Sequence, residues 1–349
     1  MIRNLSVAAA VAVGLLIAVS APVVGAAAPS YVALGDSYSS GVGTRTYIND
    51  GTSCQRSVYA YPSLIAAARG YSLNLRACSG AKVSDVTSTQ LSALTATTSY
   101  VTISVGGNDA GFADVLTECA QPGWMSDCNG AINGAQAYIN NTLPGSLSTL
   151  YASIRSRAPK AKVVVVGYPR VFNGEDCNAL TWFSPDEETR LNQTADLINS
   201  KISAQATAKG FTFANPTTAF TGHAVCADVE YLNGLSNPVS DSYHPNKAGH
   251  ASGYTPLVSP KLTGTAVVAT ARVSSLAGRT ATSQAARQRQ YAAADSLIKP
   301  QTFRLPNLHS AKALAAAKRA GVDVNSRASV DRADKAYSAA QARAWRLSH

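Results

Sequence analysis

The chain has 349 residues and a formal net charge of +10, but that charge is unevenly distributed. Residues 261–349 contain 15 Lys and Arg against 4 Asp and Glu, a net of +11, whereas residues 1–260 contain 15 against 16, a net of −1. No stretch beyond the N-terminus is apolar for long enough to cross a bilayer, which argues against an integral membrane protein.

The N-terminal segment has the layout of a secretory signal peptide. Arg3 precedes the apolar run 7–19, and small residues follow up to Ala28. A membrane anchor is the alternative, but the run is short and ends before Pro29. We expect a signal peptide over residues 1–28, cleaved after one of residues 26–28, and therefore a secreted, extracellular protein.

Short β-branched or alternating runs alternate with helical patterns between residues 30 and 260. The clearest helix opens at Ser184, with Pro185 at its first position and Glu187 completing a capping box, and Gly210 stops it. This alternation predicts an α/β fold, a three-layer α/β/α sandwich with a central, mostly parallel sheet. The predicted strands are 31–34, 73–77, 100–105, 162–166 and 211–214.

The composition changes near residue 260. We expect a catalytic domain over residues 29–262 and a basic, Ala- and Arg-rich tail over residues 263–349. Ala, Arg, Gln and Lys favour helices over 283–295, 309–320 and 329–345. Because large apolar residues are few, the tail is expected to be loosely ordered or conditionally helical.

Six cysteines in an exported chain favour three disulfides. Sequence alone leaves several pairings open, and metal binding is the alternative, although no Cys-x-x-Cys pair is present. Pairing between neighbours closes the shortest loops, and each bridge would add about 2–4 kcal/mol. The expected pairs are Cys54–Cys78, Cys119–Cys128 and Cys177–Cys226.

Three polar turns follow predicted strands, so they fall at the carboxyl edge of the sheet, where open α/β folds place their sites. Ser37, in Gly-Asp-Ser, is the candidate nucleophile, and its own backbone N–H can face an oxyanion. Asn108, in Gly-Gly-Asn-Asp, offers a side-chain donor, and Gly80 offers an unobstructed backbone donor. Each motif alone is a common turn; together they predict an oxyanion hole.

His244 is the candidate base. It follows Asp241 by three residues and precedes Pro245, which places it on a loop at a helix start. A carboxylate at that distance can orient Nδ1–H of the ring. Of the other histidines, His223 lies near Cys226, His250 in an apparent helix, and the remaining two in the tail.

Together these motifs resemble the SGNH (GDSL) hydrolase superfamily, and within it the secreted actinobacterial lipase and phospholipase A1 branch. The four named residues occur in order as Ser37, Gly80, Asn108 and His244 over residues 31–258. The resemblance implies an acyl-enzyme on Ser37, His244 as base, and an oxyanion hole from Ser37, Gly80 and Asn108. It also implies no metal or other cofactor. In some relatives a main-chain carbonyl, here that of Ser242, orients the histidine instead of a residue such as Asp241.

The sequence therefore predicts a secreted serine ester hydrolase acting on acyl esters of lipids, either a lipase/esterase or a phospholipase A1. A carbohydrate O-deacetylase is the nearest alternative, and a surface-binding protein acting through its basic tail is another. The expected partners are the acyl-ester substrate and, through the tail, an anionic surface. We expect a monomer and no nucleic-acid partner. Loop residues Tyr47, Tyr59, Trp124 and Met125 are candidates for an acyl groove.

Overall fold

The computed structural model describes residues 1–2 and 27–348, so the expected signal peptide lies almost entirely outside the described residues. Five parallel strands form one sheet in the order β2-β1-β3-β4-β5. Every strand overlaps a run predicted from the sequence. The strands are β1 (Ser30–Gly35), β2 (Ser72–Leu75), β3 (Tyr100–Ser104), β4 (Lys162–Val166) and β5 (Thr212–Ala214).

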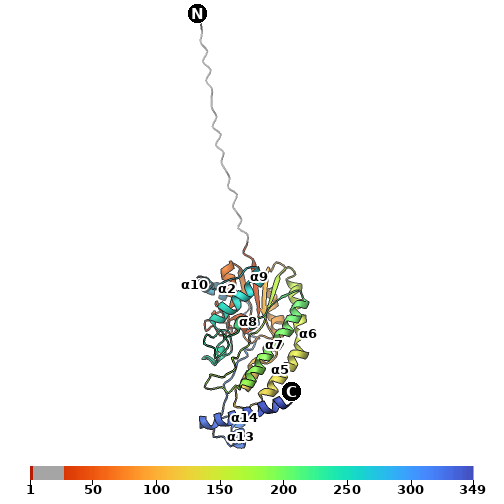
Figure 1. The fold of residues 1–349 in the computed structure, drawn as a ribbon. Helices are drawn as coiled ribbons and strands as arrows, with labels where there is room; N and C mark the ends of the chain where they lie inside the picture. Colours follow the sequence, from red (N-terminus) through yellow and green to blue (C-terminus); the bar gives the residue numbers. More distant parts are fainter. Residues whose placement is uncertain (3–26, 349) are drawn as a thin grey trace.

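Helices cover both faces of this sheet (Figure 1). One face is covered by α2 (Tyr61–Arg69) and α9 (Thr255–Thr263), and the other by α6 (Leu143–Arg157) and α7 (Pro185–Ala208), against which α5 (Cys128–Asn141) packs. The predicted capping box begins α7. This confirms the predicted α/β/α sandwich.

Shorter elements connect these layers. They are α1 (Ser37–Ser40), α3 (Val83–Asp85), α4 (Phe112–Cys119), α8 (Thr217–Phe220), the π-helical turns Val86–Gln90 and Gly249–Tyr254, and the 3₁₀ turns Leu91–Ala93 and Val239–Asp241.

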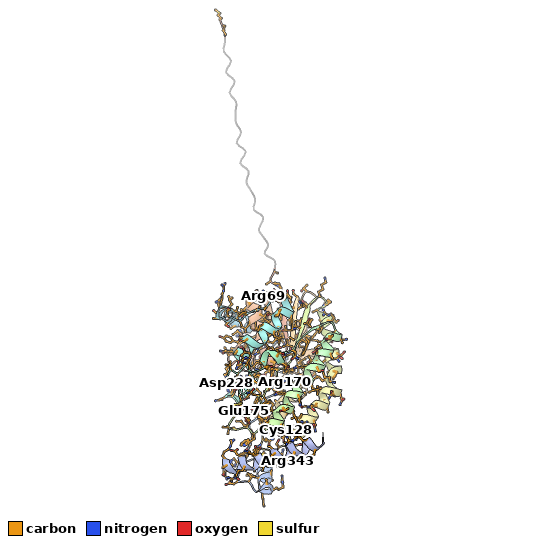
Figure 2. All side chains as sticks on the ribbon, viewed as in Figure 1. Arg69, Cys128, Arg170, Glu175, Asp228 and Arg343 are labelled. Carbon is orange, nitrogen blue, oxygen red and sulfur yellow. A yellow bond between two sulfur atoms is a disulfide. The ribbon has the colours of Figure 1, made fainter. Side chains whose placement is uncertain are left out.

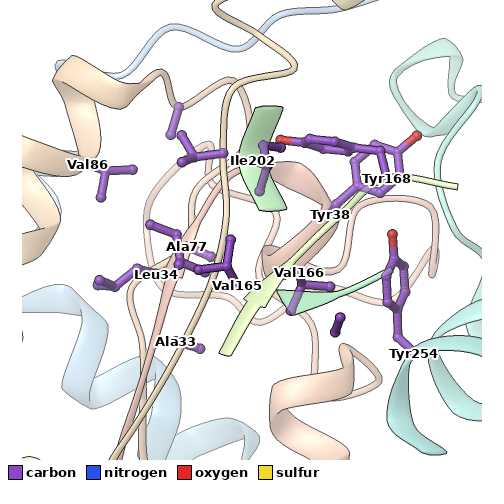
Figure 3. Packing of buried hydrophobic residues seen from close by; sticks show 14 of the residues in the cluster. Ala33, Leu34, Tyr38, Ala77, Val86, Val165, Val166, Tyr168, Ile202 and Tyr254 are labelled. Carbon is purple, nitrogen blue, oxygen red and sulfur yellow. The ribbon is translucent and has the colours of Figure 1, made fainter. Parts of the chain in front are cut away.

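The main core lies between the sheet and its helices. Leu34 of β1 and Val165 and Val166 of β4 are buried, with Ile202 of α7 and Tyr254 also in the cluster (Figure 3). Strands covered on both faces need apolar residues at successive positions, which explains the Val-rich run of β4.

The point where strand order reverses lies between β1 and β3, which is where such sheets usually place a ligand site. The chain leaves β1 through Gly35, whose φ is +117°, and a Cβ there would lie 2.1 Å from the Ser104 carbonyl oxygen. Only glycine fits this close approach. It directs the next two residues, Asp36 and Ser37, to the carboxyl edge of the sheet.

Residues 263–348, here called the C-terminal extension, form packed helices. They are α10 (Ala271–Arg279), α11 (Ala281–Arg289), α12 (Ala292–Asp295), α13 (Ala311–Ala320) and α14 (Arg327–Ser348). The sequence did not predict α10, and the helix predicted over 283–295 is divided into two. The extension contacts α2 and β2 at one end of the molecule and carries α13 and α14 at the other (Figure 1).

Three disulfides join the pairs Cys54–Cys78, Cys119–Cys128 and Cys177–Cys226, which confirms the predicted neighbour pairing. In the described part of the chain, none of the helices combines the length and apolar character needed to cross a membrane.

Candidate active site

Ser37 and His244 meet at the carboxyl edge of the sheet. Nε2 of His244 lies 2.9 Å from Oγ of Ser37, and Nδ1 lies 2.8 Å from the carbonyl oxygen of Ser242. Because a carbonyl oxygen only accepts hydrogen bonds, Nδ1 carries the proton and Nε2 is the free acceptor. This tautomer allows Nε2 to accept the proton of the serine hydroxyl.

The carboxylate of Asp241 makes no hydrogen bond to His244. Its carboxylate accepts a hydrogen bond from the Tyr47 hydroxyl, and its main-chain oxygen accepts one from Asn233 Nδ2 at 3.2 Å. The expected contact with Nδ1 is made by the Ser242 carbonyl, the alternative that the sequence left open. The cause is local: Tyr243 has a left-handed φ of +58°, which turns the chain between Ser242 and His244 so that the carbonyl meets the ring.

Burial sets the protonation of the imidazole. Desolvation lowers the pKa of His244 to about 4, and the hydrogen bond to Ser242 and the charge of Asp241 offset only part of that fall. The ring is therefore neutral at pH 7, as a general base must be. Burial also lowers the pKa of His250 to about 3, and its Nδ1 accepts a hydrogen bond from the Tyr61 main chain.

The three predicted oxyanion donors lie on loops that are tied together. Cys78 N–H donates to the Gly35 carbonyl at 3.0 Å, which brings the Gly80 loop to the end of β1. Asn108 Nδ2 donates to the Ala81 carbonyl at 3.1 Å, joining that loop to the one after β3. Among the described residues, the Gly80 N–H donates no backbone hydrogen bond. The Ser37 N–H begins α1, where helical geometry leaves amides unpaired.

A buried carboxyl group that sequence reasoning missed supports the nucleophile turn. Asp36 accepts hydrogen bonds from the Tyr168 hydroxyl at 2.5 Å, the Ser104 hydroxyl at 2.9 Å and the Tyr38 N–H at 3.1 Å. Burial raises the pKa of Asp36 to about 6 despite these donors. The Gly-Asp-Ser motif could have indicated Asp36 as the N-cap of α1, but no local pattern pointed to Tyr168.

An apolar pocket opens beside Ser37. Its walls combine Tyr38 and Asn108 near the nucleophile with side chains from α4, α5 and α7, principally Phe112, Val115, Leu116, Ile139, Leu191 and Ile198. None of the four aromatic or Met candidates from the loops lines this pocket. Trp124 and Met125 pack against the extension, Tyr47 binds Asp241, and Tyr59 faces Lys247.

The comparisons with known proteins agree with this geometry. The GDSL-like Lipase/Acylhydrolase family matches residues 33–252, which include every candidate site residue. "Lipase 1" of Streptomyces coelicolor is 45% identical over 67% of this chain and 87% of its own length. "Lipase" of Streptomyces rimosus is 44% identical over 69% of this chain and 89% of its own length.

Two solved structures are similar in fold and sequence. The extracellular lipase of Streptomyces rimosus has a TM-score of 0.63 and 42% identity, covering 66% of this chain and 98% of its own. Phospholipase A1 of Streptomyces albidoflavus NA297 has a TM-score of 0.63 and 42% identity, covering 67% of this chain and all of its own. The chain therefore belongs to the GDSL-like lipase/acylhydrolase family and is a carboxylic ester hydrolase.

Proposed function

We propose that this hydrolase cleaves the carboxylic esters of lipids, as a lipase/esterase or a phospholipase A1, through an acyl-enzyme on Ser37. The observation that carries the proposal is the Ser37–His244 pair at the mouth of an apolar pocket. A pocket walled by Val, Leu, Ile and Phe side chains suits an alkyl chain, because burying apolar surface contributes about 25 cal/mol per Å². Relatives named as lipases and a phospholipase A1 support the same substrate class.

In the first half-reaction, Ser37 Oγ attacks the ester carbonyl carbon as its proton moves to Nε2 of His244. The carbonyl oxygen becomes an oxyanion, which the N–H groups of Ser37 and Gly80 and the amide of Asn108 would bind. The tetrahedral intermediate then expels the alcohol, which takes the proton from His244. The acyl group remains on Ser37.

In the second half-reaction, water gives a proton to the now neutral His244 and attacks the acyl carbon. A second oxyanion forms at the same donors and collapses, releasing the acid, and Ser37 Oγ recovers its proton from the imidazolium. The Ser242 carbonyl holds Nδ1–H throughout, so the ring stays in the productive orientation.

The proposal is tested with the mature protein on p-nitrophenyl esters from acetate to palmitate, beside Ser37→Ala. We expect Ser37-dependent hydrolysis that peaks at medium or long chains, and a loss of about 10⁴-fold or more in the variant. Hydrolysis of acetate alone would favour the carbohydrate deacetylase. A folded protein inactive on every ester, or a biological effect that survives Ser37→Ala, would favour a surface-binding role.

The identity of the orienting group is tested by Asp241→Asn. Loss of a true triad carboxylate costs about 10⁴-fold in kcat. Because the Ser242 carbonyl already binds Nδ1–H, we expect Asp241→Asn to lower kcat only a few-fold. A loss of about 10⁴-fold would restore Asp241 to the role that the sequence suggested.

We further propose that the protein is exported and that its extension attracts anionic surfaces. Five cations on α13 and α14 are exposed, and no acid of the described residues forms a salt bridge with them: Lys318, Arg319, Arg332, Lys335 and Arg343. Figure 2 labels Arg343 at the end of the molecule opposite Arg69. Exposed Lys and Arg near an anionic lipid surface contribute about 1 kcal/mol each.

Vesicle binding tests this surface. We expect the full chain to bind vesicles containing phosphatidylglycerol but not purely zwitterionic ones, and the binding to weaken with salt. Replacing the five cations by Gln should abolish it, whereas replacing Arg157, Lys160 and Lys162, which are exposed on the catalytic domain, should not. Unchanged binding of the five-fold variant would refute the proposal.

A further inference from the structure

The C-terminal extension contacts the catalytic machinery from two sides. Its segment 299–301 covers Gly80 so closely that a Cβ there would lie 2.2 Å from the Lys299 carbonyl oxygen. Phe303 packs edge-on against Tyr243, the residue before His244, with ring centroids 5.0 Å apart. Because the family match ends at residue 252, these contacts come from outside the matched region.

The extension also supplies the charge partner of a buried arginine. The side chain of Arg76 is fully buried, and Asp295 of α12 is the one acid that pairs with it within residues 27–348, at 2.7 Å. Two more groups of the extension contact Arg76. Gln288 Oε1 accepts a hydrogen bond from its guanidinium group at 2.9 Å, and the centroid of the Tyr291 ring lies 3.9 Å from its guanidinium carbon.

Asp295 joins a second buried arginine at the same time. Its carboxylate lies 2.8 Å from Arg56, which also pairs with Asp50 at 2.7 Å, and all four side chains are at most 2% exposed. Two positive and two negative charges therefore balance inside the protein. Without Asp295, Arg56 would keep Asp50 as its partner, but the buried guanidinium group of Arg76 would have no charge partner among residues 27–348, an arrangement that is strongly unfavourable.

This ion-pair network holds the backbone that leads to Gly80. Arg56 donates to the main-chain oxygen of Ala77 at 2.9 Å and to that of Arg76 at 3.2 Å. The next residue, Cys78, is bonded to Cys54 and donates its N–H to Gly35. The backbone that leads to Gly80 is thus held by Arg56, whose charge is balanced by Asp50 and by Asp295 of the extension.

We infer that Asp295 is a positioning residue for the oxyanion hole, acting through Arg56 and Arg76, and that the extension is an integral part of the active centre. The inference rests on the proposed function, in which the Gly80 N–H binds the oxyanion. A misplacement of about 1 Å in a catalytic group can cost about 10²-fold in rate. Substrate binding in the apolar pocket is separate, since no residue of the extension lines it.

The test measures kcat and KM on a soluble p-nitrophenyl ester, and the inhibition constant of an alkyl boronic acid. The boronate adduct of Ser37 is tetrahedral and places an oxygen where the oxyanion forms. Full-length Asp295→Asn, with native near-ultraviolet circular dichroism, should lower kcat about 10²-fold and weaken the boronate by a similar factor, with little change in KM. Asp295→Glu, which keeps the carboxylate, should recover most of kcat.

Two further variants complete the series. Asp334→Asn removes the charge of a carboxylate on α14 that accepts a hydrogen bond from the Gly123 N–H, far from Arg76, and should keep wild-type kcat. Gln288→Met removes one acceptor from Arg76 without altering the charge balance, so it should fold. We expect a smaller loss of kcat than in Asp295→Asn, again with little change in KM. If Asp295→Asn does not fold, the kcat and boronate affinity of Gln288→Met decide whether the inference holds.

A folded Asp295→Asn with wild-type kcat would overturn the inference. A rise in kcat would do so too and would make segment 299–301 an inhibitory cover. An unchanged kcat and boronate affinity in Gln288→Met would count equally against it. Failure of the proposed function is distinguishable, because then the wild type itself would lack activity that depends on Ser37.

Discussion

The catalytic body (residues 30–262) and the C-terminal extension reach burial by different means. The body buries long aliphatic side chains between its own sheet and helices, such as Ile103, Leu147 and Ile202. The extension has few such residues. Its α13 places Ala313, Ala316 and Ala317 against aromatic residues of the body.

This comparison shows that a segment with few large apolar residues can be ordered by packing against apolar side chains of another part of the chain. Trp124 and Trp182 belong to the body, yet they pack in the cluster that contains Val330 and the alanines of α13. A polar contact fixes how the two parts pack together: Asp331 accepts a hydrogen bond from Trp182 Nε1 at 2.9 Å. The hydrophobic content of a segment alone therefore underestimates the burial available to it when the partner supplies the large side chains.

Apart from replacement of Ser37 itself, the largest expected effect lies in the body and concerns the oxyanion hole. Asn108→Ala removes a donor of the proposed oxyanion site, and we expect kcat to fall about 10²–10³-fold with little change in Tm. Initial rates on a medium-chain p-nitrophenyl ester measure it. Asn140→Ala, at an exposed position on α5, is the matched control and should match wild type. Comparable losses in both variants would show that the effect is not local to the site.

The pH dependence of the body follows from the burial of His244. Its pKa, lowered to about 4 from an ordinary value of 6.5, means that the imidazole of His244, the proposed base, becomes protonated only as the pH falls towards 4. We expect kcat/KM at pH 5 to keep about nine-tenths of its plateau, whereas an imidazole of ordinary pKa would leave about 3%. A pH–rate profile with circular dichroism at each pH checks this. An acid limb near pH 6.5 would show that His244 is solvated.

Much of the body was predictable because its signals are local. Strand runs, the capping box of α7 and the turns that carry Ser37 and Asn108 are each encoded within a few residues. Neighbouring cysteines also pair as predicted. Long-range partners had no such signal: Tyr168 binds Asp36 across 132 positions of sequence.

The same reason explains why the sequence left the partner of His244 open and did not indicate how the extension packs. Choosing between Asp241 and Ser242 depended on the left-handed backbone of Tyr243, which its residue type does not indicate. The extension was expected to be loosely ordered because its own apolar content is low. Its ordering depends on Arg56, Arg76, Trp124 and Trp182, more than 100 residues earlier in the chain. Where the catalytic domain ends and the extension begins stays a prediction, although α9 ends at Thr263.

The smallest expected effect lies in the distal part of the extension. Val330→Ala shortens a side chain that is 1% exposed in the cluster with Trp182. The loss of buried apolar surface should lower the stability of this cluster by about 1–2 kcal/mol. Since this cluster is separate from the main core, we expect faster hydrogen exchange in α13 and α14 while exchange in the sheet and kcat stay unchanged. Val268→Ala, at a position of the same extension that is 73% exposed, should change neither. Equal acceleration of exchange in the sheet would show that body and extension unfold as one cooperative unit, and the distinction between them would then concern composition alone.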